Sequence, residues 1–184
     1  MPPGLKAIEA AAAACVLDAA RLEGLPAVLE SLGAEASSLY SGPGAADLAD
    51  VAPYLVGLVA GSPFSQWVLG EAWGRSGGIL IVSEVGLDEL RNHFRHFLMV
   101  IDEAGKALYF RFYDPRVLRI FLPTCDAEQL RALFGPITAF VVEDEDPGKA
   151  LRFTLAGGDL VTETIDLAKE GPSGRPRIEW KGRG

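Results

Sequence analysis

Basic residues are the minority charge in this chain. Lysine and arginine total 17, against 25 aspartates and glutamates, which gives a net charge of −8. Binding to nucleic acid or to anionic lipid depends on neutralising phosphate with Lys and Arg. The composition therefore argues against both kinds of ligand, and neither nucleic acid nor a membrane is predicted as a partner.

Cysteine is scarce as well. Cys15 and Cys125 lie far apart in the sequence, and neither belongs to a CxxC pattern or to a Cys/His pattern with metal-ligand spacing. Each is predicted to pack as a small apolar residue. We therefore expect no disulfide, no bound metal and no cofactor.

Long apolar runs are also missing. The alanine stretch Ala10–Ala14 is far shorter than the roughly 20 residues that a membrane span needs. Glu9 and Asp18 flank it, and as a signal peptide it is poor. The expected location of the protein is the cytoplasm.

Recognisable catalytic patterns are absent from the sequence. Gly77-Gly78 lacks the accompanying residues of a phosphate-binding loop. No Ser/His/Asp order or Cys/His pair emerges that would indicate a nucleophile with its base. Enzymatic activity therefore has no positive signal, and we predict a non-catalytic protein.

What the chain does contain suits one compact domain. Of its 184 residues, 49% are hydrophobic and 23% are charged. We predict a loose lead-in over 1–12, the domain itself over 13–156, and a C-terminal extension over 157–184 that ends in a frayed tail from Gly171.

Periodicity and turn residues predict alternating strands and helices. The expected strands are 13–18, 53–60, 78–83, 137–142 and 151–155, with a hairpin of 98–102 and 107–113; the expected helices are 22–32, 64–73, 87–98, 115–122 and 127–134. This order predicts an α/β (mixed α+β) fold, in which helices flank a mixed β-sheet.

The return strand of the hairpin carries an unusual pattern. Strand alternation would place Tyr109, Arg111 and Tyr113 on the face opposite Leu108 and its neighbours. Asp114 and Pro115 then suit the N-cap and first position of a helix that continues with Arg116.

We consider three roles for these residues. They could form a structural knot, in which a buried ion pair joins a strand end to a helix cap. They could contact a partner directly, or they could be catalytic, with Arg111, Tyr113 and His93 in the site of a small hydrolase or nucleotide enzyme.

Two further pairs of residues are candidates for function. His93 and His96 have a spacing that can bind metal, but no third ligand is visible nearby, and a solvated or partner-facing basic helix face is the simpler interpretation. Trp67 and Trp73 suit either the core or a binding surface, where tryptophan is enriched.

At this point the sequence resembles a known family. The segment 111–118, Arg-Phe-Tyr-Asp-Pro-Arg-Val-Leu, looks like the hallmark of the type VI secretion adaptor or effector-chaperone family, catalogued as domain of unknown function 4123. Weaker blocks agree in order: the Pro-Tyr-Leu segment 52–56, the tryptophans, the strand 78–83, the helix 87–97 and the segment 122–136. Together they span roughly 13–145.

The resemblance implies a non-catalytic adaptor with two partners. Family members bind a toxic effector in the cytoplasm and assist its delivery to a spike protein of the VgrG type. Many members carry a further C-terminal lobe, whereas this sequence stops soon after the shared region. An immunity-like or dimerisation module is the remaining alternative.

Overall fold

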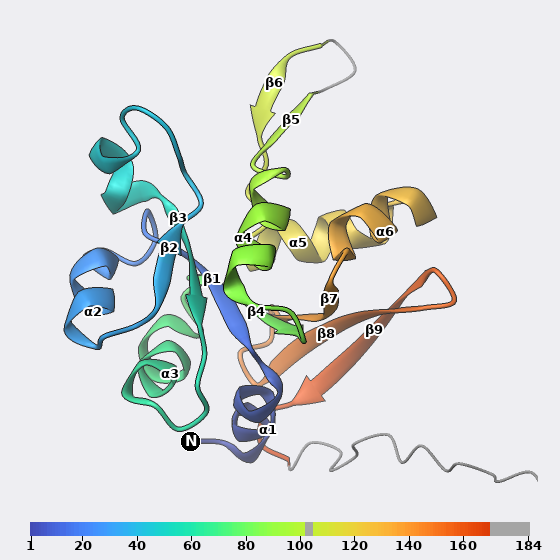
Figure 1. The fold of residues 1–184 in the computed structure, drawn as a ribbon. Helices are drawn as coiled ribbons and strands as arrows, with labels where there is room; N and C mark the ends of the chain where they lie inside the picture. Colours follow the sequence, from blue (N-terminus) through green and yellow to red (C-terminus); the bar gives the residue numbers. More distant parts are fainter. Residues whose placement is uncertain (102–104, 170–184) are drawn as a thin grey trace, which may run out of the picture.

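The computed structural model describes residues 1–101 and 105–169, and it forms one α+β domain around an antiparallel sheet (Figure 1). The strand order is β2-β3-β1-β4-β7-β8-β9. The bounds are β1 Ala14–Asp18, β2 Ala36–Ser38, β3 Pro53–Gly57, β4 Gly78–Ser83, β7 Ile137–Glu143, β8 Lys149–Ala156 and β9 Asp159–Asp166. The predicted mixed α+β class and single domain are confirmed.

Every pairing within this sheet is antiparallel, so the expected mixture of parallel and antiparallel strands was wrong. β1 lies between β3 and β4, and β4 pairs with β7 across a long stretch of chain. An alternation of strands and helices along the sequence cannot distinguish these antiparallel crossings from parallel ones.

Strand alternation builds a hydrophobic core on each face of the sheet. In β1, Ala14 and Val16 belong to one core, and Cys15 and Leu17 belong to the other. All five residues of the strand are buried, which explains its continuous apolar run. Cys15 therefore packs as a small apolar residue, as predicted.

Helices cover both faces (Figure 1). One face carries α4 (Leu87–Arg95), α5 (Pro115–Phe121), η3 (Leu122–Thr124) and α6 (Ala127–Phe134); the other carries α1 (Pro3–Ala11), α2 (Leu25–Ser31), α3 (Pro63–Trp67) and the π-helical turn η2 (Val68–Ala72). The 3₁₀ segment η1 (Ala46–Val51) precedes β3. We call the core beneath α4, α5 and α6 the first core, and the other the second core.

Two terminal expectations were wrong. Residues 3–11 form helix α1, which buries Leu5 and Ile8 in the second core, so the N-terminus is not a loose lead-in. At the other end, β9 pairs with β8 along its whole length and is part of the domain. The frayed tail expected from Gly171 lies outside the described residues.

The predicted hairpin is present, but it stands apart from the main sheet. β5 (Met99–Ile101) pairs with β6 (Ala107–Tyr109) as a separate two-stranded sheet, which we call the arm. The arm projects from the body of the domain (Figure 1). Part of the expected turn, 103–104, lies outside the described residues.

Candidate functional site

The hallmark residues lie where the chain leaves the arm and enters α5. The Asp114 side chain accepts a hydrogen bond from the Arg116 backbone N–H at 3.0 Å, and Pro115 occupies the first turn. The Arg116 guanidinium folds back on the same carboxylate, with Nε–Oδ1 at 3.0 Å and Nη2–Oδ2 at 2.6 Å. The predicted cap is therefore present, and its own helix supplies an arginine that neutralises it.

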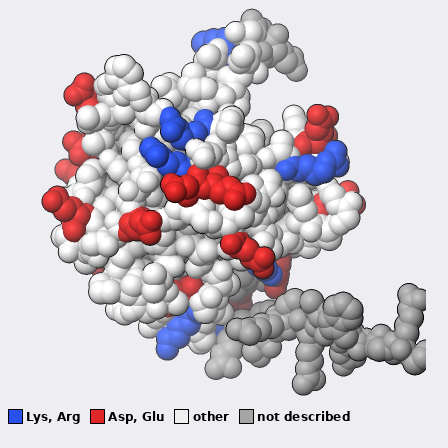
Figure 2. Space-filling view, in the orientation of Figure 1, with Lys and Arg blue, Asp and Glu red and all other residues white. Residues whose placement is uncertain are grey.

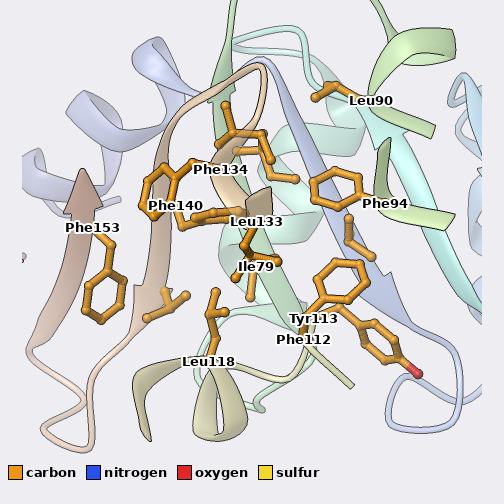
Figure 3. Packing of buried hydrophobic residues seen from close by; sticks show 14 of the residues in the cluster. Ile79, Leu90, Phe94, Phe112, Tyr113, Leu118, Leu133, Phe134, Phe140 and Phe153 are labelled. Atoms are coloured by element: carbon orange, nitrogen blue, oxygen red, sulfur yellow. The ribbon is translucent and has the colours of Figure 1, made fainter. Parts of the chain in front are cut away.

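The strand alternation proposed for 107–113 holds only as far as Tyr109. The chain turns at 112–113, so that Phe112 and Tyr113 are both buried in the first core. The two rings pack edge to face, and Figure 3 shows them to one side of Ile79 and Leu118, with the Tyr113 hydroxyl pointing away from the other labelled residues. An extended strand would bury only one of the two neighbouring rings. The turn places both in the core, where burying apolar surface is favourable.

Arg111 reaches across to the main sheet. Its Nη2 donates to Oδ2 of Asp18, the last residue of β1. The Asp18 side chain is 1% exposed and the Arg111 side chain 43%. The second oxygen of Asp18 accepts the Ala20 N–H at 3.0 Å, so both carboxylate oxygens are occupied.

These groups form one network, which we call the Arg111 cluster: Asp18, Arg111, Tyr113, Asp114 and Arg116. The Arg111 guanidinium carbon lies 5.9 Å from the centre of the Tyr113 ring, within cation–π range. Asp18 was missed as a partner because it closes an otherwise apolar run. A charged residue at the end of a fully buried strand is the signal that could have identified it.

The pKa shifts in the cluster favour a charged Asp114 and a neutral Tyr113. Burial would raise the pKa of Asp114, but hydrogen bonds from the Arg116 side chain and backbone outweigh it and lower that pKa. Burial raises the pKa of the Tyr113 hydroxyl, and its hydrogen bond with Tyr40 adds to the effect. The carboxylate and the phenol are therefore fixed in their neutral-pH forms, and neither is tuned for proton transfer near pH 7.

His93 lies elsewhere on the same face of the sheet. Its Nε2 is 2.8 Å from the Leu133 carbonyl oxygen, so the ring donates that hydrogen bond. The ring packs against Phe97 and against Gly135 at the end of α6. Burial lowers the pKa of His93, although the bond to Leu133 acts in the opposite direction. His93 is thus a half-buried contact between α4 and α6 and not part of a solvated basic face.

The two candidate tryptophans lie across the sheet from the Arg111 cluster. Trp67 and Trp73 pack against the second core while remaining partly exposed. Trp67 stacks on Phe64 with the ring centres 6.0 Å apart. The fold therefore does not bring the predicted site residues together at one place. No group of three potential metal ligands occurs among the described residues.

A second buried carboxylate begins the acidic segment 143–146. Glu143 ends β7 and is only 7% exposed, and its Oε2 accepts the Ser76 N–H at 3.0 Å. Burial raises the pKa of Glu143, against the opposing effect of the Ser76 and Gly74 N–H groups. Arg119 donates to its backbone carbonyl at 2.6 Å, which ties α5 to this end of the sheet.

The arm presents the most unusual surface of the described residues. All six residues of its strands are exposed, among them Ile101 at 76% and Tyr109 at 68%. At its base a groove of about 660 Å³ separates the arm from the segment 39–48, and we call it the arm groove. Its lining includes Tyr40, Leu48, Arg95, Met99 and Tyr109.

No helix among the described residues is long and apolar enough to cross a membrane. Comparison with curated proteins found no match, and comparison with solved structures found none either. The sequence profile of one family, described as "Domain of unknown function (DUF4123)", matches residues 15–132. That match covers more than half of the chain, including most of β1, the arm, the Arg111 cluster and most of α6, and it establishes that the chain belongs to the DUF4123 family.

Proposed function

We propose that this protein is a non-catalytic cytoplasmic adaptor of a type VI secretion system, which binds a toxic effector and assists its loading onto a VgrG-type spike. Two considerations lead to the proposal. The segment 111–118 resembles the hallmark of secretion adaptors. The chain also belongs to the DUF4123 family, which is the family that this segment resembles.

The observation that supports binding most directly is the arm. A two-stranded hairpin is marginally stable in water by itself, and this one leaves apolar side chains exposed on both of its faces. Contiguous exposed apolar surface is typical of sites that bind another protein, since covering it is favourable by about 25 cal/mol per Å².

The Arg111 cluster supports a non-catalytic role. Asp18 and Asp114 are each paired with an arginine and accept backbone hydrogen bonds as well. An enzyme would need a group free to take or give a proton in contact with substrate. The cluster is better suited to holding the base of the arm against β1 and α5.

Co-expression with the products of the neighbouring genes tests the proposal. We expect the tagged full-length chain to retain an effector or a spike protein through affinity purification and gel filtration. The double variant Ile101→Ser/Tyr109→Ser should lose the partner. Ile120→Ser is the matched control, because Ile120 is equally apolar and 73% exposed but lies on α5. Recovery of the chain alone, with its neighbours expressed and folded, would refute the adaptor function.

A further inference from the structure

The arm groove contains charge as well as apolar surface. Arg95 lines it from the end of α4, and Asp47 lines the opposite wall. No salt bridge joins Arg95 to any described residue, and the same is true of Arg91, one turn earlier on the helix. Two unpaired guanidinium groups therefore stand together at this edge of α4.

Helical geometry places both arginines on one flank. Residues four apart lie one above the other, so Arg91 and Arg95 share a side of α4. Leu90 and Phe94 point into the first core, and His93 lies on the opposite flank against α6. Figure 2 shows blue side chains below the arm, with red side chains directly beside them.

Arg91 is the more informative of the two. Its Nε is buried and has no hydrogen-bond partner among the described residues. A buried unsatisfied donor on a charged group costs more than a neutral one and is rare in a finished site. In a chain of net charge −8, two arginines without a carboxylate partner among the described residues are available to a carboxylate of another molecule.

The apolar wall of the groove belongs to the arm. Met99 and Tyr109 are paired across the ladder and both line the groove. Because side chains alternate along a strand, Ile101 lies on the same face as Met99. Leu48, which is 44% exposed, contributes apolar surface from the facing segment.

We propose that the arm groove binds a polypeptide segment of the partner that places apolar side chains against the arm and a carboxylate against Arg91 and Arg95. The apolar contact supplies affinity, and the arginines select for acidic over basic segments. This inference rests on the adaptor function, because it names the chemistry of the segment that the adaptor recognises.

A pair of peptides tests the preference on the full-length protein. One alternates leucine with glutamate and the other alternates leucine with lysine, each about ten residues long, which is the upper length of an ordinary strand. We expect fluorescence anisotropy to show at least about tenfold tighter binding of the glutamate peptide. Raising the salt from about 50 mM to about 300 mM should weaken that preference, since it screens partly exposed charges.

Variants assign the preference to this groove. Arg91→Gln/Arg95→Gln should remove most of the discrimination between the peptides. Arg131→Gln, the same change on α6, should leave it intact. Ile101→Ser/Tyr109→Ser should weaken both peptides alike, because it removes only the apolar contact.

Several outcomes would overturn the inference. The first is equal binding of the two peptides, and the second is a dissociation constant above about 1 mM for both of them. The third is a preference for the glutamate peptide that is unchanged in Arg91→Gln/Arg95→Gln. Binding to anionic vesicles that is lost in the same variant would assign the groove to a membrane instead. Recovery of a partner by co-purification, alongside any of these results, would leave the adaptor function standing while the acidic-segment inference fails.

Discussion

Replacing Arg111 by alanine removes the cation that neutralises Asp18 at the end of β1. Breaking a fully buried ion pair costs about 3–5 kcal/mol, because the remaining charge is left without a partner, whereas exposed pairs contribute at most about 1 kcal/mol. Here the carboxylate is 1% exposed, but the arginine is 43% exposed, so water could reach the vacated side. We therefore expect a loss of about 2 kcal/mol in the free energy of unfolding, between these two limits.

A chain of this length loses about 2–4 °C of melting temperature per kcal/mol. Arg111→Ala should therefore lower the melting temperature by roughly 4–8 °C in a thermal unfolding experiment. Arg131→Ala changes the net charge equally and should shift it by less than about 2 °C, as expected for a surface substitution.

A double-mutant cycle separates the ion pair from the other contacts of Arg111. In an Asp18→Asn background the alanine substitution should cost about 1 kcal/mol less, because no buried charge is left behind. Equal costs in the two backgrounds would contradict a structural role for the pair. An unchanged melting temperature combined with lost effector binding would instead make Arg111 a direct contact.

Three further predictions concern the buried contacts around the sheet. Gly135→Ala should lower the free energy of unfolding by about 1–3 kcal/mol, because a Cβ there would lie 2.4 Å from Cε1 of His93. Gly33 is the control, since it also has a positive φ but has open space around it. Gly33→Ala should lower the melting temperature by less than Gly135→Ala does in thermal unfolding. Burial holds the pKa of His93 below 6.5, so the contribution of this residue to stability should be complete above pH 6.5 and decline as the pH falls below that value. His93→Gln should flatten this part of the curve of melting temperature against pH. An unchanged slope would contradict the assignment of His93 as a half-buried neutral contact. Burial raises the pKa of Glu143 above 4.5, so the charged form of this side chain opposes folding at higher pH. Glu143→Gln keeps an acceptor for the Ser76 N–H. This variant should raise the melting temperature slightly at pH 7 but not at pH 4.

Local chemistry was predictable from sequence where the cause lies within a few residues. Asp114 caps α5 with Pro115 behind it, and Asp126 forms a capping box with Gln129, a pairing that their spacing of three residues indicates. The hairpin at 98–113 followed from its alternating residues and its turn. In each case the hydrogen-bond partners are close along the chain, so the pattern itself specifies the structure.

Long-range partners were not predictable in the same way. A buried ion pair was one of three roles considered for Arg111, but 93 positions separate it from Asp18, and only the crossing of β1 beside the arm's base decides that choice. Glu143 begins the acidic segment 143–146, and only the fold shows that it is buried and accepts the Ser76 N–H. His93 looked solvated, because helical periodicity identifies the face toward the sheet but not a neighbouring helix such as α6.

The sequence by itself determined the α+β class, the helix caps and the family resemblance, because these depend on residue order and on the spacing of apolar side chains. Tertiary structure alone decided which charges are paired, which tryptophans face the core, and that the arm stands clear of the main sheet with Arg95 at its base. The physical reason is that burial and ion pairing depend on distance in space, and a sequence pattern specifies such distances only over a few neighbouring residues.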